Sequence, residues 1–229
     1  MKNNSMIYIT GDLHCPIDIS KLNTHNFPEQ KTLTKSDYVI ICGDAGIVWD
    51  GGKEDQYWQN WLETRNFTTL FVDGNHENFD MLDNMPTKEW NGGLVHEVQP
   101  SVLHLMRGHV FEIGGVKLFA MGGAASHDRW NRKIRVSWWP QEEITTQDMR
   151  TAMVNLDRHS WNVDIVISHC APATIEKKLS SWYDATNSSY FLEDLRHQVE
   201  FKKWYFGHYH IDLKMDEHYV ALYNSVIPI

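Results

Sequence analysis

The chain has 229 residues and a formal net charge of −9 with neutral histidines. Its 42% hydrophobic and 22% charged residues are typical of a globular protein and exclude a disordered tail, a collagen-like repeat and a disulfide-dense mini-protein. The acidic balance also disfavours stable binding of long nucleic acids, which are held mainly by Lys and Arg. Binding of a phosphate at a locally positive site remains compatible with this negative net charge. We expect a single domain over residues 1–229.

The lack of a targeting signal and the spacing of the cysteines both predict a protein of the reducing interior of a cell. No apolar run approaches the ~18–20 residues that span a bilayer, and the N-terminus lacks a signal-peptide pattern. The three cysteines have no CxxC spacing. We therefore expect a cytoplasmic protein without a membrane partner. The oligomeric state is left open by the sequence.

Short apolar runs alternate with polar segments along the chain. Strand-like runs cover residues 6–10, 38–42, 69–72, 163–168 and 203–206. Helix-compatible segments cover residues 54–65, 79–84, 141–158 and 188–201. This alternation predicts an α/β fold with parallel strands. Further runs at 102–107, 109–113 and 116–121, a Gly114-Gly115 turn and a turn at Asp216-Glu217 predict antiparallel hairpins as well.

Metal-ligand side chains follow directly after five of these strand-like runs. They are Asp12 with His14, Asp44, Asn75, His169, and His208 with His210; His76 follows Asn75 as a further histidine. Sites in open α/β sheets form beyond the carboxyl ends of strands, so these side chains should converge. Imidazole, carboxylate and amide ligands without thiolates suit Mn, Fe, Zn, Co or Ni. Seven such ligands exceed the need of one ion and indicate two ions that share a carboxylate.

The ordered set Asp-x-His, Gly-Asp, Gly-Asn-His-Glu, His and Gly-His-x-His spans residues 11–210. It resembles the signature of the calcineurin-like metallophosphoesterases. The resemblance implies a four-layer αββα fold, with two mixed β-sheets packed as a sandwich and flanked by helices. It also implies two divalent or trivalent metal ions. The ligands would be Asp12, His14 and His210 for the first ion, Asn75, His169 and His208 for the second, and Asp44 as the bridge.

The same resemblance implies hydrolysis of a small phosphate mono- or diester. A hydroxide bridging the two metals would attack phosphorus directly, because metal coordination lowers the pKa of water from 15.7 toward about 7. Asp44 would act by holding both metals, and His76 would protonate the leaving oxygen or stabilise its charge. Glu77 would orient His76 or a metal ligand.

Two other functions are weighed against this one. A binding scaffold with an inactive centre is disfavoured because all seven ligands and His76 are present. A phosphoprotein Ser/Thr phosphatase is disfavoured at the second motif, where that branch has Gly-Asp-x-x-Asp-Arg-Gly. Here residues 43–49 read Gly-Asp-Ala-Gly-Ile-Val-Trp, without the arginine. The first motif also departs from the family, because Cys15 stands where glycine is common.

A second group of residues is predicted to contact the substrate. The segment 122–132 follows a predicted strand and contains His127, Arg129 and Arg132. Guanidinium groups pair well with phosphate oxygens, so we expect Arg129 or Arg132 to bind the phosphate, with His127 facing the site. Packing is the preferred role for Trp130, Trp138 and Trp139. A structural role is likewise preferred for the histidines outside the motifs: His25, His96, His104, His109, His159, His197 and His218.

Overall fold

The computed structural model describes residues 5–180 and 184–229. The strands of the first sheet are β1 (Ile7–Thr10), β2 (Tyr38–Ile41), β3 (Thr68–Phe71), β4 (Thr87–Trp90), β5 (Gly93–Gln99), β6 (Val102–Leu105) and β13 (Ile227–Pro228). Those of the second sheet are β7 (His109–Ile113), β8 (Val116–Met121), β9 (Ile165–Ser168), β10 (Lys203–Phe206), β11 (Leu213–Lys214) and β12 (Tyr219–Ala221). The α-helices are α1 (Lys53–Glu63), α2 (Phe79–Leu82), α3 (Thr146–Arg158), α4 (Ala173–Leu179) and α5 (Asn187–Arg196). Short 3-10 helices are η1 (Ile19–Leu22), η2 (Pro28–Thr32), η3 (Arg129–Asn131) and η4 (Pro140–Glu142).

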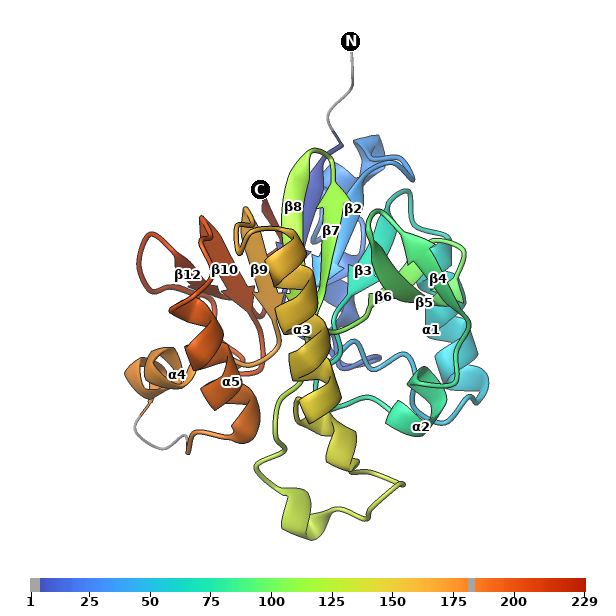
Figure 1. The fold of residues 1–229 in the computed structure, drawn as a ribbon. Helices are drawn as coiled ribbons and strands as arrows, with labels where there is room; N and C mark the ends of the chain where they lie inside the picture. The colour runs from blue at the N-terminus through green and yellow to red at the C-terminus, as the bar shows by residue number, and fades with distance from the viewer. Residues whose placement is uncertain (1–4, 181–183) are drawn as a thin grey trace.

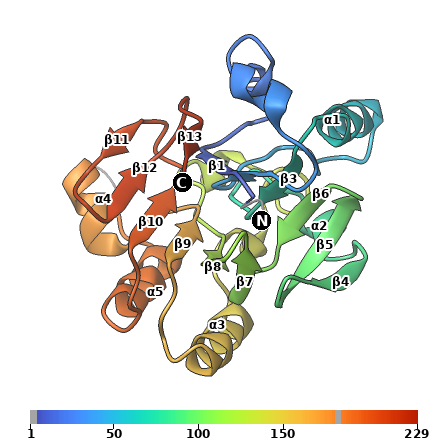
Figure 2. The ribbon, with the colours of Figure 1, turned by 90° about the horizontal axis from the view of Figure 1, so that it is seen from above.

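The two sheets pack face to face, and helices cover their outer faces (Figures 1 and 2). The strand order is β13-β1-β2-β3-β6-β5-β4 in one sheet and β11-β12-β10-β9-β8-β7 in the other. Both sheets mix parallel and antiparallel pairs; β1 and β2 are parallel, for example, whereas β7 and β8 are antiparallel. The helices α3, α4 and α5 lie outside the second sheet, and α1 lies outside the first (Figure 2). This arrangement confirms the fold that the resemblance implied.

Alternation along the strands explains the layers, because successive side chains of a strand point to opposite faces. In β8, Leu118 and Ala120 are buried between the sheets, whereas Phe119 and Met121 are buried under the helices. Central strands such as β8 are therefore buried on both faces, and their apolar runs are continuous, whereas β4 and β11 are not buried. Within residues 5–180 and 184–229, none of the helices combines the length and apolar character needed to cross a membrane.

Several predicted elements needed correction. The predicted helix 141–158 is too long, because Pro140–Glu142 forms a separate 3-10 turn and α3 starts after Thr145. Thr145 and Asp148 form a capping box there, with 3.2 Å from the Asp148 amide to Thr145 Oγ1. The predicted helix 188–201 ends early, at Arg196. The hairpin β4–β5 and the helix α4 were not predicted, and the predicted C-terminal hairpin contains only the short strands β11 and β12.

Candidate metal centre

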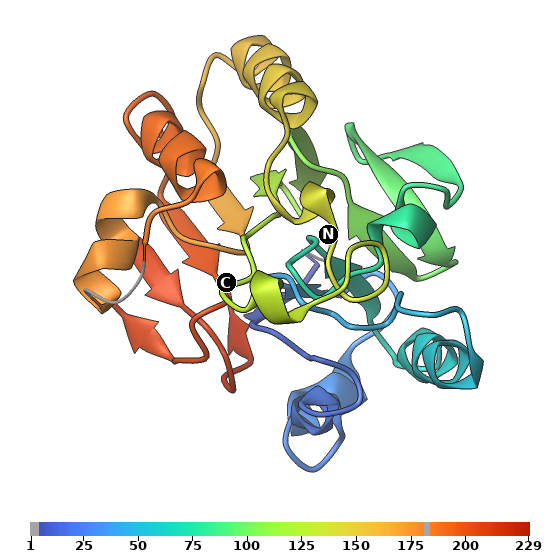
Figure 3. The same cartoon turned by 90° about the horizontal axis from the view of Figure 1, so that it is seen from below.

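The predicted ligands meet at one end of the sandwich. The strands β1, β2 and β3 run parallel, as do β8, β9 and β10, so the chain leaves each of these two groups at one common edge. The loop between β8 and α3 extends beyond this end (Figure 1) and crosses its centre when seen from below (Figure 3). Residues from both sheets and from this loop therefore share one site.

Asp12, His14 and His210 form the first cluster. One nitrogen or oxygen ligand atom from each lies within 4.8 Å of the others. His210 Nε2 is 3.2 Å from Asp12 Oδ2, and the rings of His14 and His210 are 4.9 Å apart. The Asp12 carboxylate is fully buried and accepts a hydrogen bond from the backbone N–H of His208 at 3.0 Å. The group fits one metal ion.

Asp44 lies at the middle of the site. Its Oδ2 is 3.2 Å from His14 Nε2 and 3.3 Å from His169 Nε2, and its Oδ1 accepts the backbone N–H of His76 at 2.8 Å. Burial on its own raises the pKa of Asp44, but the neighbouring His169 charge and the His14 hydrogen bond hold that pKa well below its usual value. Asp44 is thus an ionised carboxylate between histidines from both sheets.

Asn75, His169 and His208 form the remaining group. His169 Nε2 is 3.2 Å from Asn75 Oδ1, and the rings of His169 and His208 are 4.9 Å apart. The other ring nitrogen of His169, Nδ1, donates to the Cys42 carbonyl oxygen at 2.7 Å. Such a hydrogen bond orients the ring and leaves Nε2 free to bind a metal. This group approaches Asp44 through His169. A second set of ligand atoms within 4.8 Å of one another comes from His14, Asp44 and His76.

Backbone strain is concentrated on these residues. Four of the eight described non-glycine residues with positive φ are predicted ligands: His14 at 38°, Asp44 at 49°, His208 at 69° and His210 at 50°. Left-handed backbone is uncommon for residues other than glycine, and its cost is characteristic of functional sites. The fold holds these four side chains in place against a local conformational penalty.

Two glycines make the close approach of the ligands possible. A Cβ on Gly74 would lie 2.1 Å from Asp44 Oδ1, and a Cβ on Gly207 would lie 2.1 Å from Asp12 Oδ1. At these two positions the absent side chain leaves room for a carboxylate from another strand.

The donor set fits the metals predicted from the sequence. It consists of imidazole nitrogens, carboxylate oxygens and one amide oxygen, which suits Mn, Fe, Zn, Co or Ni. Cys15 follows His14 and is partly buried, and its burial raises the pKa of its thiol. Among the described residues, the groups of side chains close enough to share an ion do not include Cys15, so the geometry gives no sulfur ligand at this position.

The loop between β8 and α3 places part of the predicted substrate group against the site. Arg132 Nη2 is 3.2 Å from His76 Nε2, and Arg132 Nε is 2.7 Å from Asp128 Oδ1. The ring of His127 stacks on that of His208 at 5.4 Å. Arg129 is exposed, and within the described part of the chain its side chain makes no hydrogen bond or ion pair. The geometry thus places Arg132 and His127 against residues of the site, but leaves Arg129 outside it.

Of the three tryptophans near this loop, Trp139 has the predicted packing role. It is 1% exposed, it packs edge to face on Trp49, and its indole Nε1 donates to Asp80 Oδ2 at 3.0 Å. Trp138 is half-buried, whereas Trp130 is 77% exposed. Packing therefore does not account for Trp130.

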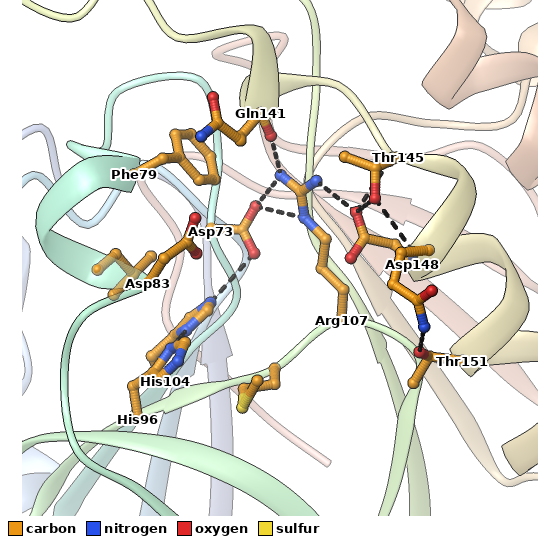
Figure 4. A pocket seen from close by; sticks show the side chains of 13 residues that line it. Asp73, Phe79, Asp83, His96, His104, Arg107, Gln141, Thr145, Asp148 and Thr151 are labelled. Atoms are coloured by element: carbon orange, nitrogen blue, oxygen red, sulfur yellow. Dashed lines mark hydrogen bonds and ion pairs between the residues drawn. The ribbon is translucent and has the colours of Figure 1, made fainter.

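A buried ion pair that the sequence analysis missed anchors both ends of the loop (Figure 4). Arg107 Nε donates to Asp73 Oδ2 at 2.8 Å, while its terminal nitrogens donate to the carbonyl oxygens of Gln141 and Glu143 at 2.8 and 3.0 Å. At the other end, the Gly123 N–H donates to the Asp73 carbonyl oxygen at 2.9 Å. The only sequence signal was an arginine at the end of the apolar run 102–107.

Two polar contacts behind the ligands were also missed. Lys21 Nζ donates to the Asp12 carbonyl oxygen at 2.6 Å and also to that of Tyr223. Asn75 Nδ2 donates to Ser126 Oγ at 3.3 Å, and Ser126 Oγ in turn donates to the Glu142 carboxylate at 2.6 Å. These contacts position two predicted ligands, Asp12 and Asn75.

Comparison with known proteins agrees with this geometry. No curated protein matches the chain. The profile of the family described as calcineurin-like phosphoesterase matches residues 5–212, which include all the predicted metal ligands. The chain therefore belongs to the calcineurin-like phosphoesterases and is a metal-dependent phosphoesterase.

Proposed function

We propose that this protein hydrolyses mono- or diesters of phosphate with a small alcohol part, at a centre for two metal ions. Asp12, His14 and His210 would hold one ion, and Asn75, His169 and His208 the other. Asp44 would contact both. The observation that carries the proposal is the position of Asp44, whose Oδ2 lies 3.2 Å from a histidine of the first group and 3.3 Å from one of the second.

When bound, the ions would supply an activated water of lowered pKa and positive charge for the phosphate oxygens. Hydrogen bonds within the protein orient the side chains that would bind the ions. His169 is held by the Cys42 carbonyl oxygen, and Asp44 is held by the His76 N–H. Because these ligands are buried and come from different strands, the site is organised before any substrate arrives.

His76 and Arg132 would act on the substrate side of the centre. Burial and the nearby Arg132 charge both lower the pKa of His76, so its ring is neutral at neutral pH. A neutral ring whose Nε2 faces Arg132 accepts a hydrogen bond from the guanidinium. His76 can therefore protonate a leaving oxygen only after substrate has displaced Arg132 and the ring has taken up a proton. Arg132, once released, would pair with a phosphate oxygen.

The test compares hydrolysis of a chromogenic monoester and diester by metal-stripped protein with and without added Mn²⁺. We expect turnover only with metal, and about two ions per chain by elemental analysis. Asp44→Asn should lower kcat/KM by more than about 100-fold, because even residues that only support ligands cost 10–100-fold. Asp157→Asn, an exposed aspartate on α3, serves as the matched control.

With a phosphopeptide added as a third substrate, the same experiment separates the alternatives. A binding scaffold would take up metal and hydrolyse neither ester, which would contradict the proposal. A phosphoprotein phosphatase would prefer a phosphopeptide over both small esters by kcat/KM. The proposal requires the reverse order.

A further inference from the structure

We propose that a cavity beside the metal centre binds the alcohol part of the substrate and selects a ring-sized, neutral or positively charged alcohol over a negatively charged one. The cavity has a volume of about 240 Å³, and we call it the alcohol pocket. Its defining residues are His14, Trp49, Asp50, Glu54 and His76. The inference rests on the proposed function, because it assigns the alcohol part of the hydrolysed ester to the space next to the reacting phosphate.

The location of the pocket follows from its wall of histidines. His14 belongs to the first metal-ligand cluster, and the His76 ring lies edge to face on it at 5.2 Å. His76 is also the residue expected beside the leaving oxygen. A phosphate held between the metal ligands and Arg132 would therefore project its alcohol past His76 and into this space.

Trp49 gives the pocket a fixed aromatic wall. Its ring packs edge to face on the buried Trp139, with the centroids 5.5 Å apart. Its backbone N–H donates to Asp55 Oδ2 at 2.7 Å, and its carbonyl oxygen accepts from Asn78 Nδ2 at 2.6 Å. An indole held in this way binds a flat group or a cation at little entropic cost.

The charges on the two sides of His76 have opposite sign. The alcohol pocket has the exposed carboxylates of Asp50 and Glu54 at its edge, and none of its lining residues is a lysine or arginine. On the other side, Arg132 lies against His76 Nε2. A phosphate is thus favoured on the Arg132 side, whereas a carboxylate or a second phosphate on the alcohol would meet Asp50 and Glu54.

The size of the alcohol pocket further limits which substrates fit. A volume of about 240 Å³ is below the roughly 300–1,000 Å³ of typical small-molecule sites. It accommodates a single ring or a short aminoalkyl chain. A dinucleotide or a protein chain would extend far outside it.

The first test measures how the charge of the alcohol affects kcat/KM of the Mn²⁺-loaded protein at low salt. The probes are phosphocholine, with a cationic alcohol, and 3-phosphoglycerate, with an anionic one. We expect wild type to prefer phosphocholine and the double variant Asp50→Asn/Glu54→Gln to lower that preference about tenfold, the size expected for exposed charges at low ionic strength. The control is Glu217→Gln, whose side chain is 85% exposed and outside the pocket lining; it should leave the preference unchanged.

The second test needs no turnover. Benzyltrimethylammonium, an aromatic cation without phosphate, is titrated into metal-free protein, and the indole N–H signal of Trp49 is followed by NMR. Trp49→Phe assigns this signal. We expect a saturable shift in wild type, and a Kd at least about tenfold weaker in the Asp50→Asn/Glu54→Gln variant.

The outcomes separate the two proposals. Normal hydrolysis with the same ester preference in wild type and double variant would overturn the alcohol pocket and leave the proposed function intact. An unshifted Trp49 signal would also overturn the pocket. Failure to hydrolyse any ester with metal bound would instead overturn the proposed function, whatever the Trp49 signal does.

Discussion

The ring of His76 lies between a metal-ligand cluster and a guanidinium. It packs on His14 at 5.2 Å on one side and faces Arg132 at 3.2 Å on the other. Its backbone N–H is bonded to Asp44, so the residue cannot move without disturbing the centre. This position predicts that His76 acts on the leaving oxygen, while its ring nitrogen also lies within 4.8 Å of ligand atoms of His14 and Asp44.

The role of His76 can be tested by its dependence on the leaving group. We expect His76→Ala to lower kcat about 10²–10⁴-fold for an alkyl phosphate, whose leaving oxygen needs a proton. The loss should be much smaller for a nitrophenyl ester, because nitrophenolate leaves without protonation. Metal content and Tm, measured on the same preparation, should match wild type. Full turnover of the alkyl ester by the variant would contradict this role.

The loop between β8 and α3 is held at both of its ends by one ion pair. Asp73 precedes Gly74 at the end of β3, and Arg107 follows β6; both are buried, at 1% and 9% exposure. Asp73 receives the Gly123 N–H, while Arg107 holds the carbonyl oxygens of Gln141 and Glu143. Loss of the pair should therefore affect folding and the position of the loop together.

Arg107→Met leaves the Asp73 carboxylate buried without its cation. Breaking such a pair costs about 3–5 kcal/mol in free energy of unfolding, and we expect this loss in urea unfolding. The double variant Arg107→Met/Asp73→Asn should recover part of it, because no buried charge remains unpaired. Arg107→Lys should also be destabilised, since an ammonium cannot make the same set of bonds. If Arg107→Met unfolds like wild type, the anchoring role is wrong.

Glu142, in η4 near the end of the same loop, predicts that the stability of the fold depends on pH. Burial raises its pKa to about 7, although the hydrogen bond from Ser126 acts in the opposite direction. In an unfolded chain the pKa of Glu is about 4.3, so between about pH 4.3 and 7 the folded state binds more protons. Its contribution to stability is therefore full below about pH 4.3 and is lost as the pH rises toward 7.

The measurement is urea unfolding of wild type and Glu142→Gln at several pH values from 4 to 8. We expect the variant to lose less stability than wild type as the pH rises through this window, because its side chain does not titrate. Glu217→Gln, which changes an exposed carboxylate, should follow the wild-type curve. Parallel curves for wild type and Glu142→Gln would show that Glu142 titrates normally.

The sequence predicted the elements that carry the ligands better than those that support them. Buried strands such as β2 and β10 are continuous apolar runs that end in Gly-Asp or Gly-His, so both the strand and its ligand were visible. The strand β5 was missed because half-buried residues interrupt its apolar positions. The Asp73–Arg107 pair was missed for another reason: it joins residues 34 positions apart, and only the packing of β3 beside β6 brings them together.

At the scale of the whole molecule, the candidate centre lies across the junction of the two sheets. Asp12, Asp44 and Asn75 follow strands of the first sheet, whereas His169 and His208 follow strands of the second. The sheets also share a buried apolar layer, with Ile9, Leu70 and Ile167 among its members. A bound ion would add a direct link between ligands of both sheets at one end of this layer.

Metal binding should therefore stabilise the entire fold, beyond its effect on the loops. A ligand at 100 times its Kd stabilises the folded state by about 2.7 kcal/mol. For a protein of this size each kcal/mol raises Tm by roughly 2–4 °C, so we expect Mn²⁺ to raise the Tm of metal-stripped protein by about 5–10 °C. Asp44→Asn in the first sheet and His169→Ala in the second should each reduce the shift, whereas Asp157→Asn should retain it. A full shift in His169→Ala would contradict the role of His169. A full shift in a variant that lacks His169, His208 and His210 would mean that the first sheet alone holds the metal, and the centre would not join the two sheets.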